Sequence, residues 1–414
     1  TGVGAFALDV NTTGASNTAL GSAALGSNTT GADNTAVGAG TLDANTTGSE
    51  NTALGRNALG ANTTGANNVC LGSDTMLNNT TGGANTVVGY GALQVNTTAS
   101  NNVAIGDRSL FNNTTGAGNS AVGKDSLKAN TTGADNTALG MSALLTSTTG
   151  TNNVALGTKA LMDSTTGGYN TAVGAYANEN NTTGTSNVSV GRASLNENST
   201  GDNNVAIGRN ALLANTTADN NTAVGYNSLT ANTTGTANVA VGYNALDAST
   251  TAGSLTAVGF QALSSSVTDG DTVAMGTNAG VNATTSYSVI VGSQANGSGA
   301  MTGDSNSYLG YASGYANTSG ANNTGIGRSA LGANTTGTAS VAVGMQALDA
   351  NTTGSYNNGV GVGSLGANTT GSSNTAIGHA ALGGNTSAAN NTAVGYTALL
   401  ANTTGANNTA VGYG

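Results

Sequence analysis

The sequence predicts an all-β protein: a parallel β-solenoid, or β-roll, of 24 coils with a 17-residue repeat. The main observation is a glycine that recurs with this period from Gly4 to Gly412, always after Val, Ile, Leu or Met. The span is 412 − 4 = 408 residues, or 24 periods of 17. The spacing departs from 17 only around Gly292, where the two steps are 292 − 276 = 16 and 310 − 292 = 18. A period this short is typical of one structural unit stacked on itself. We call these residues the repeat glycines.

Composition is the second observation that favours a repetitive β-fold. The 414 residues include 65 Gly, no Pro and no Trp, and only 6% are charged. Collagen is excluded because Gly does not fall at every third position and Pro is absent. The formal net charge of −10 gives no electrostatic footprint for nucleic acid. Because no run of 18 apolar residues occurs, we expect no membrane insertion within this segment.

Each repeat reads as two short strands and two turns. In the Asn-Thr-Ala-Val-Gly segment, as at 391–395, Thr and Val alternate with Ala, which predicts a short strand ending at the repeat glycine. The Ala-Leu pair that follows, as at 398–399, predicts a second short strand. The Asn-Thr-Thr-Gly corner, as at 402–405, predicts a return turn in which Gly adopts a positive φ. Coils built in this way stack about 4.8 Å apart.

The repeats predict a single continuous domain over residues 1–414, excerpted from a longer chain because it opens and closes in mid-repeat. The regularity weakens at about 255–316. There the Asn four residues before the repeat glycine is replaced by Leu255, Thr272 and Ser288. The Leu four residues after it is replaced by Gly280, Asn296 and Gly314.

Charged residues are confined to a few positions of the repeat. All eight basic residues lie one, two or five places after a repeat glycine, and acidic residues share these positions or fall in variable loop positions. Charges stacked one coil apart would repel, whereas Asn side chains can hydrogen-bond to the next coil. We therefore expect the Asn positions to form structural ladders. The single cysteine, Cys70, replaces an Ala and is expected to be a small buried residue.

The Ala two residues before the repeat glycine predicts an oligomer. If Thr and Val point to the core, this Ala points to the opposite face, yet it is kept small and uncharged almost throughout. A strand restricted on both faces is buried on both faces. We therefore expect a homo-oligomer, most simply a trimer, with Ala121 and Ala240 in the contact between chains.

The strand segment resembles that of a known family. The segments Asn102-Val103-Ala104-Ile105-Gly106, Asn204-Val205-Ala206-Ile207-Gly208 and Ser340-Val341-Ala342-Val343-Gly344 resemble the head repeats of YadA-like trimeric autotransporter adhesins. Similar repeats are found in bacteriophage tail fibres. The resemblance covers the whole chain and implies a left-handed, homotrimeric β-roll on a cell or virion surface. The 17-residue coil is longer than the usual head repeat, and the extra residues lie at the Asn-Thr-Thr corner.

Residues suited to catalysis are scarce, so the sequence predicts a protein that is not an enzyme. His379 is the only histidine, and the acidic residues are scattered singly, so we expect neither a metal site nor a cofactor. The leading hypothesis is an extracellular structural or adhesive fibre that presents a rigid repetitive surface. Two alternatives remain open: a self-assembling extracellular filament, suggested by the uncapped ends, and an ice-binding β-solenoid, suggested by the rows of Thr.

Candidate binding residues lie in the irregular coils. Tyr308, Tyr311 and Tyr315 cluster there and could contact a glycan or a protein on a host surface. The 18-residue spacing predicts a bulge at about 293–306, with Asn296-Gly297-Ser298-Gly299 looped out. The Asn-x-Thr/Ser sequons at Asn11, Asn28, Asn45 and Asn62 are candidate glycosylation sites. A purely structural role for these corner residues is the favoured interpretation.

Overall fold

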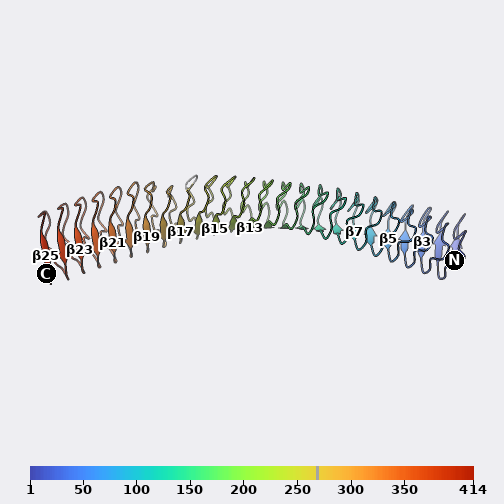
Figure 1. The fold of residues 1–414 in the computed structure, drawn as a ribbon, viewed down its shortest axis with the longest axis horizontal. Helices are drawn as coiled ribbons and strands as arrows, with labels where there is room; N and C mark the ends of the chain where they lie inside the picture. The colour runs from blue at the N-terminus through green and yellow to red at the C-terminus, as the bar shows by residue number, and fades with distance from the viewer. Residues whose placement is uncertain (267–269) are drawn as a thin grey trace. The chain divides into compact units, whose positions relative to one another are not determined.

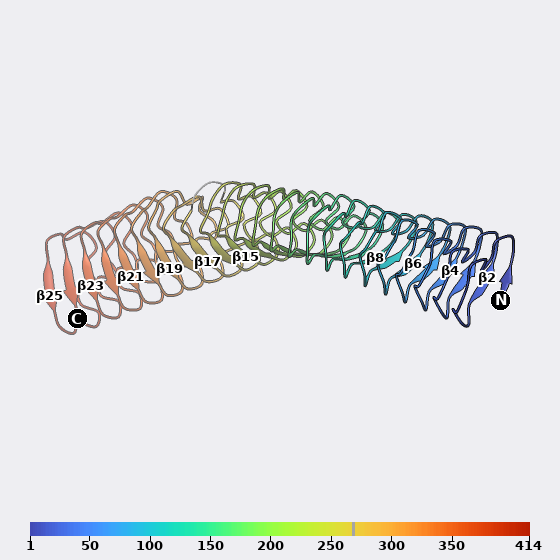
Figure 2. The same cartoon turned by 45° about the vertical axis from the view of Figure 1, so that its right-hand side comes forward.

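The computed structural model describes residues 1–266 and 270–414. The described residues form two compact units, Thr1–Ile207 and Gly208–Gly414. Each unit is a parallel β-solenoid with one short strand per coil (Figures 1 and 2), which confirms the predicted all-β fold and its 17-residue repeat. No helix long and apolar enough to cross a membrane occurs in the described ranges. Residues 267–269, which fall in the irregular region expected at 255–316, lie outside the described residues.

The strands of the first unit are β1 (Gly2–Val3), β2 (Thr18–Leu20), β3 (Thr35–Val37), β4 (Thr52–Leu54), β5 (Val69–Leu71), β6 (Thr86–Val88), β7 (Val103–Ile105), β8 (Ser120–Val122), β9 (Thr137–Leu139), β10 (Val154–Leu156), β11 (Thr171–Val173), β12 (Val188–Val190) and β13 (Val205–Ile207). Those of the second unit are β14 (Thr222–Val224), β15 (Val239–Val241), β16 (Thr256–Val258), β17 (Val273–Met275), β18 (Val289–Val291), β19 (Ser307–Leu309), β20 (Thr324–Ile326), β21 (Val341–Val343), β22 (Asn358–Val360), β23 (Thr375–Ile377), β24 (Thr392–Val394) and β25 (Thr409–Val411).

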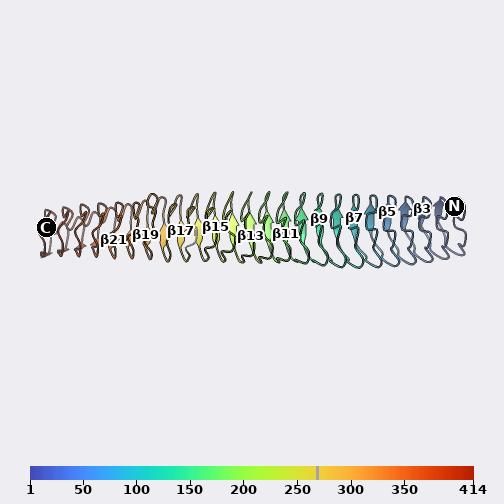
Figure 3. The ribbon, with the colours of Figure 1, turned by 90° about the horizontal axis from the view of Figure 1, so that it is seen from above.

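Within each unit, neighbouring strands run parallel and pair in register, so the same position of the repeat stacks from coil to coil (Figure 3). In the first unit, Ala36 of β3 lies opposite Ala53 of β4. The register also holds through the irregular spacing, since Ala274 of β17 lies opposite Ile290 of β18, and Ile290 lies opposite Tyr308 of β19. Each repeat position therefore forms a row of side chains along its unit.

The buried face of the strands is the opposite of the one expected from the sequence. In every strand from β2 to β24 the middle residue is buried and the two outer residues are exposed or half-buried. The inner strand row, two residues before the repeat glycine, is thus the Ala row. Its side chains face the Leu row, four residues after the repeat glycine: Sγ of Cys70 lies 3.8 Å from Sδ of Met76. Because Leu fills this thin core from one side, only a small residue fits opposite it.

The segment after the repeat glycine is a series of turns, and the second strand expected there is not formed. Alternate residues have a positive φ, as at Ala23 (58°) and Leu25 (52°). A left-handed conformation costs about 1–2 kcal/mol for a residue with a Cβ, whereas burial of a Leu side chain gains about 1.5–3 kcal/mol. Hydrogen bonds to both neighbouring coils also stabilise this segment: the Ala23 amide donates to the Ala5 carbonyl (2.8 Å) and the Leu25 amide to that of Thr41 (3.0 Å).

Two glycines in each repeat are required for different reasons. The repeat glycine Gly38 has a φ of 136°, and a Cβ there would also clash with the carbonyl of Gly55 in the next coil. The corner glycine Gly31 was expected to have a positive φ but lies outside that region. It is required by close approach instead, because a Cβ would meet the Gly48 carbonyl and the Asn28 side chain. Both glycines let the backbones of adjacent coils stack closely.

The predicted Asn ladders are confirmed. In the corner row, Asn45 Nδ2 donates to Asn28 Oδ1 (2.8 Å) and to the Gly48 carbonyl (2.9 Å). In the strand row, four residues before the repeat glycine, Asn34 Oδ1 accepts from the Asn51 amide (3.0 Å). Both rows are almost wholly buried, so the ladders replace most of the hydrogen bonds to water that these amide groups lose on folding.

The bulge predicted at 293–306 is only partly correct. The coil keeps its strand register but loses part of the regular turn series, and the extra residue falls near the corner, at 299–300. The prediction that Asn296 is looped out is wrong. Asn296 is fully buried in the Leu row, and its side chain donates to the carbonyls of Gly314 (3.2 Å) and Asn317 (3.1 Å). In this coil the buried side chain of Met301 lies beside Asn306 of the strand row, at the corner where other coils carry the Asn ladder. With the ladder interrupted there, the corner tolerates a change in length.

Candidate functional site

The residues expected at a contact between chains lie inside the coil. Ala121 and Ala240 both belong to the inner strand row and are fully buried within a single chain. They therefore cannot contact another chain, and this prediction is wrong. The alternation in the sequence correctly grouped Ala on one face and Thr with Val on the other, but the wrong group was assigned to the core.

The face of the strands that points away from the core carries no charged residue, which is the property that the sequence led us to expect for a contact between chains. Two outer strand rows lie one and three residues before the repeat glycine and consist of Val, Leu, Ile, Met, Thr, Ser and Asn in the strands of the described residues, without a charged residue. Several large apolar side chains on this face are half exposed, such as Leu54 (49%), Leu139 (50%) and Leu309 (50%). We call these two rows the outer strand face.

The sequons are built into the corner ladder. Asn28, Asn45 and Asn62 are fully buried, and each side-chain nitrogen donates both to the preceding Asn and to a corner glycine carbonyl. Asn11 is half-buried and donates to the Gly14 carbonyl (2.9 Å). Attachment of a glycan to the three buried nitrogens would require the corner to open. Glycosylation of the folded protein at Asn28, Asn45 and Asn62 is therefore contradicted, and the structural interpretation of these residues holds.

The three candidate tyrosines are not brought together. Tyr308 is fully buried in the inner strand row, and burial raises the pKa of its phenol well above the usual value. It cannot meet a ligand, so its assignment to a binding site is wrong. The ring fits because Gly314 replaces the Leu that would face it, and a Cβ on Gly314 would lie 2.5 Å from the ring. Tyr311 (54% exposed) and Tyr315 (37% exposed) reach the surface.

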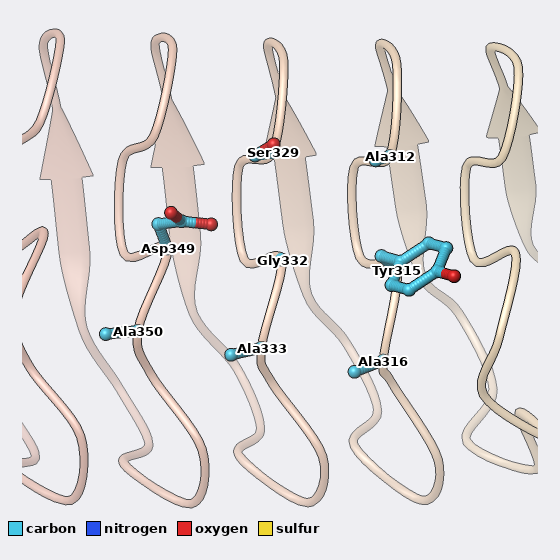
Figure 4. Close-up of a pocket in the computed structure, with 8 residues that line it drawn as sticks. All are labelled: Ala312, Tyr315, Ala316, Ser329, Gly332, Ala333, Asp349 and Ala350. Carbon is cyan, nitrogen blue, oxygen red and sulfur yellow. The ribbon is translucent and has the colours of Figure 1, made fainter.

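Tyr315 borders a shallow groove on the second unit (Figure 4). The groove has a volume of about 480 Å³ and combines the Tyr315 ring with the side chain of Asp349 and a floor of small residues. Its remaining lining residues are Ala312, Ala316, Ser329, Gly332, Ala333 and Ala350. Tyr315, Gly332 and Asp349 all lie five residues after a repeat glycine, in three successive coils, and we call this position the groove row. Tyr311 is not among the lining residues.

The groove exists because Gly332 has no side chain. In Figure 4 the Tyr315 ring and the Asp349 carboxylate lie on the two sides of Gly332, and the hydroxyl of Tyr315 points away from it. One carboxylate oxygen of Asp349 leans over Gly332, 2.6 Å from where a Cβ would be. The order Tyr, Gly, Asp in the groove row can be read from the sequence by following the repeat from Tyr315. A search for aromatic residues alone misses Gly332 and Asp349.

The Asp349 carboxylate has free acceptor capacity. None of the described residues donates a hydrogen bond to it, and it lies half-buried. Burial raises the pKa of Asp349 above its usual value, and the Arg328 guanidinium opposes this shift. A half-buried carboxylate without donors favours a ligand that brings hydroxyl or amide hydrogens.

Other exposed side chains form short aromatic stacks. Tyr226, Tyr243 and Phe260 stack in successive coils with ring centroids 5.3 Å apart, and the Arg209 guanidinium caps this stack 5.6 Å from the Tyr226 ring. His379 belongs to a second stack, 5.0 Å from Tyr396. These rings cover one another's faces, so they leave little aromatic surface for a ligand. Among the described residues, no group of three His, Cys, Asp or Glu is placed to hold a metal ion.

Comparison with known proteins gives no further identification. No protein-family model matches the chain, and no curated protein is significantly similar to it.

Proposed function

We propose that this chain is a repetitive segment of a non-catalytic extracellular fibre, structural or adhesive, that assembles with copies of itself through the outer strand face. The observation that supports this most is the absence of charge from the outer strand face in every strand from β1 to β25, despite its exposure. Charged residues appear one residue after the repeat glycine, as at Arg56 and Lys124. The exposed corner Thr, as at Thr30 and Thr47, is uncharged as well, but it is polar, whereas the outer strand face exposes large apolar side chains. Contact with another chain accounts for an exposed face that is both apolar and uncharged.

The size of the face favours association along its length. A three-residue strand covers about 10 Å by 4.8 Å, so each strand offers about 50 Å². The thirteen strands of the first unit thus offer about 600 Å², close to the roughly 800 Å² that each partner buries in a stable interface. Three copies is the number implied by the resemblance to YadA-like heads, and that resemblance also suggests a cell or virion surface.

The test compares two exposed side chains of one coil. Leu139 ends β9 on the outer strand face and Met141 lies two residues further, past the repeat glycine, and each is 50% exposed. We expect multi-angle light scattering to give a mass of three chains for the wild type. Leu139→Glu should weaken this assembly, because a carboxylate would be buried in the contact without a partner. Met141→Glu serves as the control and should leave the mass unchanged.

A wild-type mass of a single chain at micromolar concentration would contradict the proposed assembly, as would equal masses for the two variants. Two other outcomes would point to the alternative functions. Growth into particles of no fixed mass would favour a self-assembling filament. Thermal hysteresis of the wild-type solution would favour ice binding, for which the Thr residues of the outer strand face would be the candidates.

A further inference from the structure

We propose that the groove formed by Tyr315, Gly332 and Asp349 binds one neutral hexose of a surface glycan. This inference deepens the adhesive part of the proposed function and rests on it. Three features of the groove carry the argument: the apolar ring at one end, the free carboxylate at the other, and the gap between them.

The dimensions of the groove follow from the coil repeat. Tyr315 and Asp349 occupy the same row two coils apart, a separation of about 10 Å between backbone positions. Gly332, in the coil between them, supplies no side chain, and Ala316, Ala333 and Ala350 complete an apolar floor. The volume of about 480 Å³ is within the range of small-ligand sites, which is about 300–1,000 Å³. A single sugar ring is a ligand of suitable size.

The chemistry of the two ends selects the class of ligand. A hexose carries C–H groups, which contact an aromatic ring, and hydroxyls, which donate to a carboxylate. Tyr315 borders the groove with its hydroxyl directed away from Gly332, and the carboxylate of Asp349 leans over Gly332 without a donor from the described residues. An acidic sugar would be repelled by Asp349 and by the net charge of −10.

The groove stays accessible in the proposed assembly. Its residues come from the turn segments after the strands, which face the inner strand row across the core: a Cβ on Gly359 of β22 would lie 3.5 Å from Cγ of Leu348. The side chain of the next residue, Asp349, instead lines the groove. The groove therefore opens on the side of the coil away from the outer strand face, so that face can be covered by other chains while the groove remains free.

The first unit provides a natural control. Gly26 and Asp43 repeat the pair Gly332 and Asp349, with an Asp43 oxygen 2.8 Å from where a Cβ of Gly26 would be. The preceding residue of that row is Asp9 rather than a tyrosine. This place has the carboxylate and the gap but no aromatic ring, so it should not hold a sugar.

Methyl β-D-glucoside and methyl β-D-galactoside are the probes, with N-acetylneuraminic acid as the acidic comparison. Saturation-transfer NMR and titration should show binding of at least one neutral hexoside to the wild type and weaker or no binding of the acid. Tyr315→Ala should weaken binding about tenfold. Asp349→Asn, which keeps the shape of the side chain, should weaken it by about tenfold or more. Gly332→Leu should abolish it, since Leu occupies this row at Leu145 and would fill the gap.

Asp43→Asn and Tyr356→Ala are the matched controls and should bind as the wild type does. Tyr356 is 63% exposed and lies outside the groove. Circular dichroism should show that each variant is folded. Lack of binding by the wild type, equal binding by all variants, or a preference for the acidic sugar would overturn the inference. The Leu139→Glu variant separates the two proposals, because it should lose assembly yet keep the hexoside site.

Discussion

The coil around Cys70 in the first unit and the coil around Tyr308 in the second fill the same thin core with side chains of opposite size. In the first, a small residue of the inner strand row faces a large one of the Leu row, with Cys70 Sγ 3.8 Å from Met76 Sδ. In the second, the large Tyr308 faces Gly314. The coil thus fixes the total volume across the core and leaves open which side supplies it.

The same exchange, in which a large residue of one row faces a small residue of the other, also occurs between neighbouring coils. Ile290 is the other large residue in the inner strand row, and its Cδ1 lies 2.9 Å from where a Cβ would be on Gly280 of the preceding coil. The irregular region is therefore a repacked version of the regular coil. Three predictions test this comparison, from the largest expected effect to the smallest.

The largest effect is expected from breaking the Tyr308–Gly314 pair. Tyr308→Ala should lower the free energy of unfolding by about 3–5 kcal/mol, because it leaves a cavity beside Gly314. Gly314→Leu should lower it by about 1–3 kcal/mol through overpacking. The double variant restores the regular coil and should be close to the wild type. Denaturant unfolding of all four proteins measures the coupling, and additive losses in the double variant would refute the exchange in size.

A gain in stability is expected at a position of the Leu row where a regular coil carries a polar residue. Asn178 occupies the Leu row of the first unit, is fully buried, and finds no hydrogen-bond partner for either side-chain atom among the described residues. Asn178→Leu should raise the free energy of unfolding by about 2 kcal/mol, since it removes an unsatisfied buried amide and restores the common residue. Asn112→Leu, at an exposed position of the same unit, is the control and should have little effect. A loss of stability in Asn178→Leu would contradict this account of the buried amide.

The smallest effect is a pH dependence confined to the irregular coil. Burial raises the pKa of Tyr308 in the folded state, while the unfolded chain has the ordinary value near 10. Only the unfolded state then loses the proton above pH 10, so stability falls as pH rises through that range. At pH 11 the loss should be about 1.4 kcal/mol. Tyr308→Phe should lack this part of the pH dependence, and identical profiles for the two proteins would contradict it.

The sequence predicted the repeat and its ladders because both depend on spacing alone. Period, strand position and the Asn rows follow from which residues recur in every repeat, and stacking in register brings them together. The side of the strand that is buried was predicted wrongly, because alternation shows which residues share a face but not which face is inside. The decisive fact is that Leu25 turns inward at a positive φ, and this leaves room only for Ala19 and its equivalents.

The site was predicted less well than the fold. Tyr315 was found as an exposed aromatic residue of the irregular coils, but Tyr308 was grouped with it although it is buried. The partners Gly332 and Asp349 lie in regular coils, where no exception to the repeat draws attention to them. Their significance appears only when one row is followed through three coils, since the groove depends on the absence of a side chain at one position.

The in-register stacking of every row has a consequence for how such a chain can change in evolution. Deletion of residues 46–62 would join Asn45 directly to Thr63, and the corner ladder would close with Asn79 in the place of Asn62. Recombination between copies of the repeat can therefore lengthen or shorten the gene by whole coils while every junction remains native. Insertions of other lengths would shift all rows at once, except at a corner such as that near Met301, where the short spacing of the preceding coil compensates for the extra residue.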